Sequence, residues 1–505
     1  MKNVLIFLLN LFCVLSIWSQ SDSLRDRHWL LGYSSGLPPD FHFGGSDLDF
    51  NQRPVAVNYE FRSLDFSRTN ASICDKEGHL LFYTNGMSIC NAFGDTIPNG
   101  DSLAPAIWPQ ILDWHEYWIV DGALILPAPG NENLYYLLHQ DMEYSEEEET
   151  YISVHFFYTL VDMSTAEGEV LSKNNLLSSD TLDMGYITAV RHGNGRDWWI
   201  VRGGGDSNVF RIFLLDPTGI YLHHSQAIGP LIEKGSVGQA VFSPDGTKYA
   251  RLDATTFWGP KSVKLYDFDR CSGMLSDVRE TIFLEGVIPG GLAFAPNSRY
   301  LYVSVKDSLF QYDTAVEDFG NTRQLIAVWS GAFSMVPPLA AVFYVMRLAP
   351  DGKIYMATGN GTVCLHVIHN PNEAGQACNF EEMGLTLPTY NLSLPNFANY
   401  SLGAWEGSPC DTLGTVGLSE PFEKPDWSVW PNPAKAGGLW EIDFGNTEDG
   451  KRKLCLYEID GKLLGSYAEL QARTFYLSVP EIPGIYLLEI QNSVGEVRYK
   501  RLVVE

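Results

Sequence analysis

Short apolar segments alternate with Gly-bearing polar turns along most of the chain. An apolar strand, a polar turn and an aromatic-rich strand recur at 73–83, 189–201, 241–250, 294–303 and 348–357, with a degraded copy at 129–137. Alternation of this kind is typical of strands. Proline presets φ and glycine accepts positive φ, so Pro244-Asp245-Gly246 suits a tight turn. The pattern therefore predicts a series of antiparallel hairpins in an all-β chain.

The hairpins recur with a period of about 50 residues. Turn positions 195, 246, 298 and 352 lie 51, 52 and 54 residues apart, which fits one blade of a β-propeller. Residues 28–408 at this period hold seven blades, although six hairpins are visible. We expect Trp29–Tyr33 to supply a strand to a seventh blade, completed by the segment before Cys410, since closure removes sheet edges. Six blades is one alternative, and an array of β-sandwiches is another.

A second pattern follows a Gly/Ser/Pro-bearing linker at 409–426. Alternating segments at 440–444, 453–459, 485–490 and 499–504 predict half-buried strands. Residues 427–505 are therefore expected to form a small β-sandwich. Two inserts interrupt the first pattern, an acidic run at 143–149 and a stretch around Pro337-Pro338; the acidic run is predicted to be a solvated loop.

The first 19 residues have the pattern of an export signal. Lys2 precedes an apolar run from Val4 to Trp18, and small or polar residues follow. The run is shorter than the roughly 20 residues that span a bilayer, and no later segment is long and apolar enough to do so. We expect an exported mature chain without a transmembrane segment, secreted or held at the outer surface.

Charge narrows the class of partner. The 505 residues hold 34 Lys and Arg against 61 Asp and Glu, a net charge of −27. Such a surface repels phosphate backbones and anionic lipid headgroups, so nucleic acid is not an expected partner. Solubility is the simplest explanation of the acidic composition, and binding of Ca²⁺ is the more specific alternative.

The eight cysteines do not form a dense disulfide framework. Cys13 lies in the export signal. Cys74 and Cys90 are predicted on the first and third strands of one meander, too far apart to bond across the middle strand. Cys378 and Cys410 remain a candidate bridge. The spacing of Cys and His does not suggest zinc.

Candidate catalytic residues are few. Ser34 lies in a G-x-S-x-G match at 32–36, but lacks the strand, helix and downstream partners of a nucleophile elbow. His115-Glu116 lacks the second histidine of a zincin helix. His223-His224 is expected in an exposed turn rather than as a ligand pair. A hydrolase would need paired carboxylates, and the sequence does not choose among many, which include Asp47, Asp49, Asp75 and Asp183.

Residues 28–400 resemble the β-propeller proteins exported by Bacteroidetes. The resemblance is carried by Ala71–Asp75, Leu80–Gly86 and Asn91, and later by Arg347–Tyr355, Val367–Asn372 and Leu394–Phe397. It implies a surface or secreted binding scaffold and transfers no catalytic residue. We therefore expect a scaffold that binds protein or glycan without a cofactor. The alternative is an extracellular hydrolase, a glycosidase or peptidase, using carboxylates in the propeller channel.

Residues 427–505 resemble the type A sorting domain of the type IX secretion system. The matching residues are Pro431, Asn432, Pro433, Asp460, Gly461, Pro483, Gly484, Tyr486, Lys500 and Arg501. Trp430 stands where tyrosine is commoner. The resemblance implies passage through the type IX machinery, with the tail usually removed.

Seven Asp-Ser/Thr tripeptides resemble the O-glycosylation sequon of exported Bacteroidetes proteins. Their hydroxyl residues are Ser23, Thr96, Ser102, Thr181, Ser308, Thr314 and Thr412. We expect sugar on some of those that are exposed; an ordinary turn is the alternative role of each pair.

Overall fold

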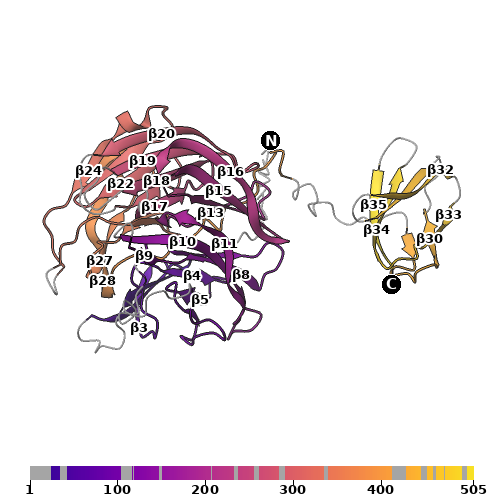
Figure 1. The fold of residues 1–505 in the computed structure, drawn as a ribbon, viewed down its shortest axis with the longest axis horizontal. Helices are drawn as coiled ribbons and strands as arrows, with labels where there is room; N and C mark the ends of the chain where they lie inside the picture. The colour runs from indigo at the N-terminus through magenta and orange to yellow at the C-terminus, as the bar shows by residue number, and fades with distance from the viewer. Residues whose placement is uncertain are drawn as a thin grey trace, which may run out of the picture. The chain divides into compact units, whose positions relative to one another are not determined.

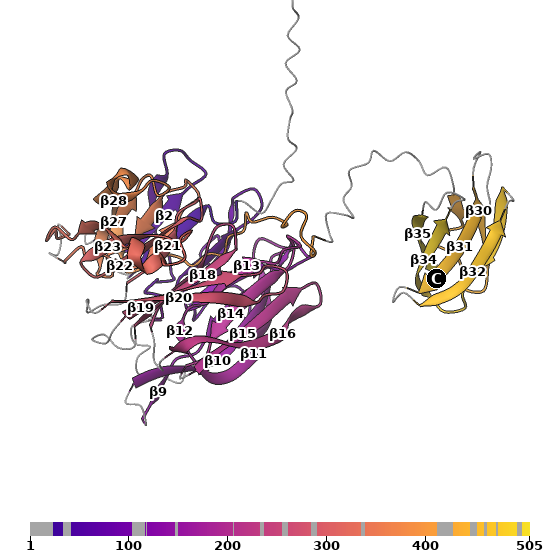
Figure 2. The same cartoon turned by 90° about the horizontal axis from the view of Figure 1, so that it is seen from above.

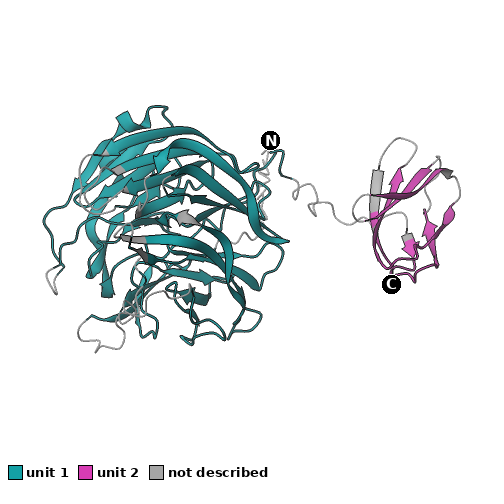
Figure 3. Cartoon of the chain, in the orientation of Figure 1, with its two compact units in different colours: residues 1–415 teal, residues 416–505 magenta. Residues whose placement is uncertain are grey.

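The computed structural model divides the chain into two compact units, residues 1–415 and 416–505 (Figure 3). It describes residues 24–33, 42–103, 117, 119–146, 150–205, 207–232, 237–254, 261–283, 290–334, 339–411, 428–444, 452–458, 462–470, 473–491 and 497–504. Residues 1–19, predicted to be an export signal, and linker residues 412–426 lie outside them.

Within the described part of unit 1, the strands pair into seven sheets. The first two are β1 (His28–Tyr33), β2 (Gly44–Asp49) and β3 (Ala56–Glu60), then β4 (Ala71–Cys74), β5 (Leu80–Thr84) and β6 (Ile89–Asn91). The third holds β7 (Ala123–Pro127), β8 (Leu134–Gln140), β9 (Glu143–Ser145), β10 (Thr150–Asp162) and β11 (Glu169–Leu182). The fourth holds β13 (Thr188–Arg191), β14 (Trp198–Gly203), β15 (Ser207–Asp216) and β16 (Gly219–Ile232).

The remaining three sheets continue the order of the chain. The fifth holds β12 (Met184–Gly185), β17 (Val237–Phe242), β18 (Lys248–Ala254), β19 (Lys261–Phe268) and β20 (Leu275–Phe283). The sixth holds β21 (Leu292–Phe294), β22 (Tyr300–Val305), β23 (Ser308–Asp313) and β24 (Gln324–Val328). The seventh holds β25 (Met346–Leu348), β26 (Ile354–Met356), β27 (Thr362–Ile368) and β28 (Phe380–Asn391).

These seven sheets are the blades of a β-propeller. Figures 1 and 2 show the strands of unit 1 from two directions. Neighbouring strands within a blade are antiparallel, except that the two-residue β12 pairs with β17 in parallel. The strands β13, β17, β21 and β25, each the first long strand of its blade, lie side by side in turn. The all-β prediction is confirmed: helical turns in the described residues are limited to short 3₁₀ segments at Phe319–Thr322 and Gly375–Cys378.

The six predicted hairpins are the first hairpins of six blades. In each turn an Asp or Asn side chain accepts a hydrogen bond from the backbone N–H two residues later; the pairs are 75/77, 131/133, 194/196, 245/247, 297/299 and 351/353. This Asx geometry is local, so every copy of the motif forms the same turn.

The first blade, β1–β3, is built differently from the other six. Trp29–Tyr33 forms a strand as predicted, and this strand pairs antiparallel with β2. Toward the second blade, the Asn70 side chain donates to Leu30 O and Cys74 N donates to Arg25 O. The segment before Cys410 forms no strand in the described residues. Instead, its residues 394–400 pack where the blades converge, and we call them the axial segment.

The axial segment is held by several blades at once. The Asn396 side chain donates to Ala123 O at 3.0 Å and to Ile187 O at 2.7 Å, and Asn396 N donates to Asn70 O at 2.8 Å. The Tyr400 hydroxyl donates to Ile125 O at 2.7 Å. These carbonyls belong to the second, third and fourth blades, so the segment lies on the propeller axis.

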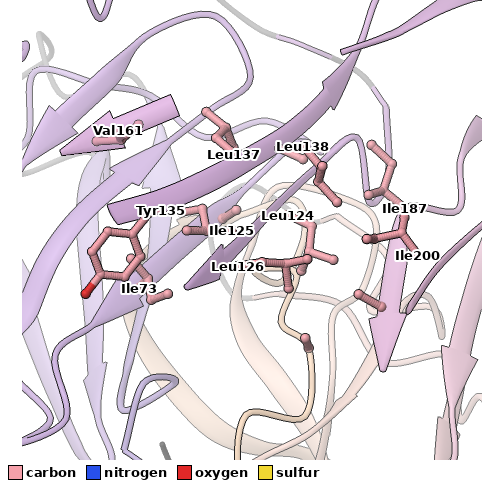
Figure 4. Close-up of a cluster of buried hydrophobic side chains, with 14 of the residues drawn as sticks. Ile73, Leu124, Ile125, Leu126, Tyr135, Leu137, Leu138, Val161, Ile187 and Ile200 are labelled. Atoms are coloured by element: carbon pink, nitrogen blue, oxygen red, sulfur yellow. The ribbon is translucent and has the colours of Figure 1, made fainter. Parts of the chain in front are cut away.

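Apolar side chains between blades form the core around this axis. One cluster joins the second, third and fourth blades and includes Ile73, Leu124, Leu137 and Ile200 (Figure 4). Ala398 and Tyr400 of the axial segment pack into the same cluster. The axial segment is therefore part of the hydrophobic core that the second, third and fourth blades share.

Cys271 and Cys410 form a disulfide with their Cα atoms 5.4 Å apart. The candidate bridge between Cys378 and Cys410 is therefore wrong: Cys378 is a free, buried thiol in the core between the sixth and seventh blades. Cys74 and Cys90 lie on β4 and β6, either side of β5, as predicted, and both are free and buried.

The acidic run at 143–149 is not wholly a loop. Glu143–Ser145 forms β9, which pairs with Thr150–Ile152 of β10 and so extends the third blade. Glu147, Glu148 and Glu149 lie outside the described residues, as does the stretch at Pro337-Pro338.

Unit 2 is a small β-sandwich, as predicted. One sheet holds β29 (Ser428–Trp430), β30 (Leu439–Asp443) and β33 (Thr474–Ser478). The other holds β32 (Leu463–Leu470), β31 (Arg452–Glu458), β34 (Gly484–Gln491) and β35 (Val497–Val504). Alternate residues from both sheets, including Trp440, Leu454 and Leu488, form its core.

Candidate functional site

The candidate site is a cavity of 390 Å³ near the propeller axis. Three consecutive repeats supply most of its wall, from the first strands and hairpin turns of the fifth, sixth and seventh blades. Phe242, Phe294 and Leu348 occupy one position of the repeat, each two residues before a turn proline (Pro244, Pro296 and Pro350) that also lines the cavity. The repeat that builds the fold therefore also builds the cavity wall.

The axial segment and the residues that follow it close another side of the cavity. Phe397, Ala398, Asn399 and Ser401 line it. The Asn399 side chain donates to Pro244 O at 2.8 Å and accepts a bond from the Ser401 hydroxyl at 2.7 Å. The Phe397 and Trp29 rings lie 6.0 Å apart, so this wall is braced against the first blade.

Arg347 of β25 lines the cavity, and its guanidinium is bonded to other groups of the protein. Its guanidinium pairs with Asp121, and it donates to Pro395 O at 3.1 Å and to the Asn396 side chain at 3.0 Å. Burial raises the pKa of Asp121 to about 6, and the pairing with Arg347 opposes that rise. This ion pair positions the axial segment, because it holds the Arg347 guanidinium where it donates hydrogen bonds to Pro395 and Asn396.

Asp26 is the carboxylate among the residues that line the cavity. It precedes β1 and is half-buried, and no side chain in the described part of the molecule donates to it. Burial raises its pKa to about 6, with Arg27 beside it acting in the opposite direction. Arg27 in turn donates from Nη1 to Phe50 O at 2.9 Å.

The cavity has the size and composition of a small-molecule pocket. Its volume falls within the roughly 300–1,000 Å³ of small-molecule pockets, and its wall is mainly apolar with a few polar groups. Glycoside hydrolysis uses two carboxyl groups about 5 to 9.5 Å apart, whereas the lining residues hold one carboxylate.

The four carboxylates named from the sequence do not meet in this cavity. Asp47 and Asp49 lie on β2, where Asp47 pairs with His28 at 3.0 Å. Asp75 caps its own hairpin turn. Asp183 is fully buried against Arg251 at 2.8 Å, a structural ion pair between blades.

Other candidates from the sequence have different outcomes. His223 and His224 are not in a turn: they lie on β16 at a bulge, with His223 edge-on to Trp199. Ser34, His115 and Glu116 lie outside the described residues. Over the residues that are described, no group of three or more His, Cys, Asp or Glu side chains is placed to hold a metal ion.

Several of the residues that carry the sorting-domain resemblance lie close together in unit 2. Asn432, between Pro431 and Pro433, accepts a bond from Val503 N at 2.8 Å, so the Pro-Asn-Pro turn contacts the strand that carries Lys500 and Arg501. Tyr486 is buried and donates to Ile482 O, which anchors the turn holding Pro483 and Gly484. Asp460 and Gly461 lie outside the described residues.

The hydroxyls of the glycosylation tripeptides differ in exposure. Thr96 and Ser102 are exposed and Ser308 is half-buried. Thr314 is 1% exposed and donates to Arg299 O, so the folded chain leaves no room for a sugar there. Ser23 and Thr412 lie outside the described residues, as does the side chain of Thr181.

Sequence reasoning missed Asp26 and the axial segment. Asp26 has no motif around it. The run Leu394-Pro395-Asn396-Phe397 carries part of the family resemblance, but its irregular pattern of apolar and polar residues does not indicate a place on the axis. One sequence feature could have indicated the cavity: a Phe or Leu recurs two residues before the turn proline in three repeats.

No helix among the described residues is long and apolar enough to cross a membrane.

Comparison with known proteins gives distant likenesses only. No family model matches the chain, and no curated protein matches it. Among solved structures, a functionally unknown protein from Desulfotomaculum acetoxidans is 11% identical, covering 73% of this chain and 100% of its own, with a TM-score of 0.39.

Two further structures show similar values. A quinonprotein alcohol dehydrogenase-like protein from Bacteroides thetaiotaomicron is 8% identical over 72% of this chain and 75% of its own, with a TM-score of 0.35. The periplasmic gluconolactonase of Pseudomonas aeruginosa is 11% identical over 94% and 98%, with a TM-score of 0.32. The propeller assignment rests on the strand pairing of this chain itself.

Proposed function

We propose that this chain is an exported recognition protein whose propeller binds a ligand in the axial cavity. The observation that carries the proposal is the cavity itself, built by three repeats and the axial segment with one carboxylate in an apolar wall. The export signal predicted at 1–19 and the acidic surface fit a chain that works outside the cytoplasm. Protein and glycan remain the two expected classes of macromolecular partner.

The mature full chain should be tested on glycan and protein arrays beside two variants at the cavity rim. Ser401 lines the cavity and is exposed, so Ser401→Trp adds bulk there with little disturbance of the core. Ser401→Ala is the matched control. If Ser401→Trp abolishes binding and Ser401→Ala retains it, the result supports the cavity as the binding site. If both variants still bind, the cavity is not the site.

We further propose that unit 2 is a type IX sorting domain. Support comes from the residues that match that domain and from the packing of the Pro431–Pro433 turn on β35. Deletion of 427–505 should leave the protein in the periplasm, as judged by cell fractionation. Undiminished surface display or secretion after the deletion would contradict the assignment.

A matched pair of substitutions tests the same proposal without deleting the unit. Lys500→Ala with Arg501→Ala alters the basic pair on β35, and Arg452→Ala with Lys453→Ala alters a basic pair on β31 of the same sandwich. We expect export to fall in the first variant and to persist in the second. Equal export of both would count against a role for the terminal motif.

Glycosylation is proposed at the exposed hydroxyls of Thr96 and Ser102. The intact mass of the exported protein should exceed that of the bare polypeptide, and Thr96→Ala with Ser102→Ala should lower the excess. A mass equal to that of the polypeptide would refute the proposal.

A further inference from the structure

We propose that the axial cavity takes a small organic cation, an ammonium group on an apolar body, with Asp26 as its counter-ion. This inference rests on the proposed function, because it assigns a ligand class to the same cavity. It follows from three properties of the wall: one carboxylate to which no described side chain donates a hydrogen bond, three phenylalanine rings, and arginine side chains that bond to other protein groups.

The carboxylate is the first property. Asp26 is half-buried in an apolar cavity, and no side chain of the described residues donates to it. A desolvated carboxylate gains more from a cation than an exposed one does, because the interaction is screened less. Asp26 thus has unfilled capacity for a positively charged ligand.

The charges around Asp26 do not fill that capacity. Arg25 precedes Asp26 in sequence and Arg27 follows it, while Tyr400 and Cys74 lie near enough to interact with it electrostatically. Arg25 donates from Nη1 to Cys74 O and to the Tyr135 hydroxyl, and Arg27 donates to Phe50 O. Burial keeps the pKa of Asp26 raised to about 6 in spite of Arg27.

The rings are the second property. Phe242, Phe294 and Phe397 line the cavity from the fifth blade, the sixth blade and the axial segment. Aromatic faces attract cations as well as apolar groups. An ammonium on an apolar body matches both the rings and the carboxylate.

The remaining guanidinium is the third property. Arg347 also lines the cavity, but Asp121 neutralises it and the Pro395 and Asn396 oxygens occupy other donors. Its charge therefore opposes a bound cation only weakly. The cavity also fits poorly with an anionic ligand, since Asp26 would repel it.

The test uses the mature full chain and three probes of similar size: phenethylamine, the neutral phenethyl alcohol and the anionic phenylacetate. Titration calorimetry at pH 8 should show the amine binding at least about tenfold more tightly than the alcohol, with phenylacetate weaker still. Asp26→Asn, which keeps the side-chain shape, should remove the preference for the amine. A thermal melt checks that the variant is folded.

A second measurement needs no variant. Because the carboxylate must be ionised, affinity of the unmodified protein for phenethylamine should fall as the pH is lowered from 8 through about 6, while affinity for the alcohol should not. Loss of both together would contradict the role of Asp26. A peptide with one lysine, run beside phenethylamine, distinguishes an ammonium on a protein from a free one.

The outcomes separate this inference from the function on which it rests. If the alcohol binds as well as the amine and Ser401→Trp abolishes both, the cation inference is overturned while the cavity remains the binding site. If Ser401→Trp leaves every bound ligand unaffected, the proposed function itself fails. Preference for the amine that is lost in Asp26→Asn and in Ser401→Trp supports both.

Discussion

At the scale of single residues, Asp26 couples the cavity to the stability of the fold. Burial raises its pKa from 3.8 to about 6, so folding favours the protonated carboxyl. Stability from this group is fully present below the unfolded pKa and is lost as the pH rises through the folded pKa. The window in which Asp26 affects the free energy of unfolding thus runs from about pH 4 to about pH 6.

Asp26→Asn removes the cost of ionising a buried carboxyl. We expect the variant to melt several degrees above the wild type at pH 8 and at the same temperature at pH 4, measured by scanning calorimetry. Asp313→Asn is the control of opposite sign, because the hydrogen bond from Arg299 lowers the pKa of Asp313. That variant should lose stability at pH 8, and a wild-type melting temperature for Asp26→Asn at pH 8 would contradict the expectation.

At the scale of elements, the hairpins were predictable and the axial segment was not. Each turn is specified within about six residues by an Asx bond and a residue of positive φ, such as Gly246 or Gly352. The axial segment depends on distant partners: Asn396 bonds to carbonyls 273 and 209 residues away. The local sequence around Asn396 therefore cannot predict these bonds.

Two equivalent glycines test how the repeats differ. Gly246 and Gly352 hold one turn position with φ of +73° and +82°. A Cβ on Gly246 would meet Arg270 Cδ and Leu402 Cδ2 at 2.8 Å, whereas a Cβ on Gly352 would meet nothing within 4 Å. Only the first turn is packed beneath the segment that follows the axial residues.

Both Gly→Ala variants should therefore lose about 1–2 kcal/mol of unfolding free energy to backbone strain. Gly246→Ala should lose a further ~1–3 kcal/mol, because its methyl group overfills a packed site. Urea denaturation measures the difference. Equal losses would show that the packing around Gly246 adjusts freely; Ser298, at φ of 59°, already shows a residue with a side chain at this turn position.

At the scale of the whole molecule, the disulfide joins two segments that are distant in sequence and share no sequence motif. Cys271 lies at the hairpin between β19 and β20, and Cys410 follows the axial segment. Cys378 was the nearer candidate in sequence, but it lies in the core between the sixth and seventh blades. Both bonded sulfurs pack on Gly193, where a Cβ would lie 2.3 Å from the sulfur of Cys410.

Removal of this disulfide should destabilise unit 1. A cross-link over a separation of 139 residues is expected to contribute about 2–5 kcal/mol. A reductant should therefore lower the melting temperature of the wild type and leave unchanged that of the Cys271→Ser, Cys410→Ser variant. A wild-type melt that is insensitive to the reductant would contradict a structural role for the bond.

The same bond changes what proteolysis can do to the propeller. Residues 271–410 form a covalent loop that contains the axial segment, and Cys410 stands five residues before the boundary with unit 2. A protease that cuts between Cys410 and β29 would free the sandwich and leave both ends of the axial segment attached to the propeller. A processed propeller would thus keep the axial segment as one wall of the cavity after the tail had been removed.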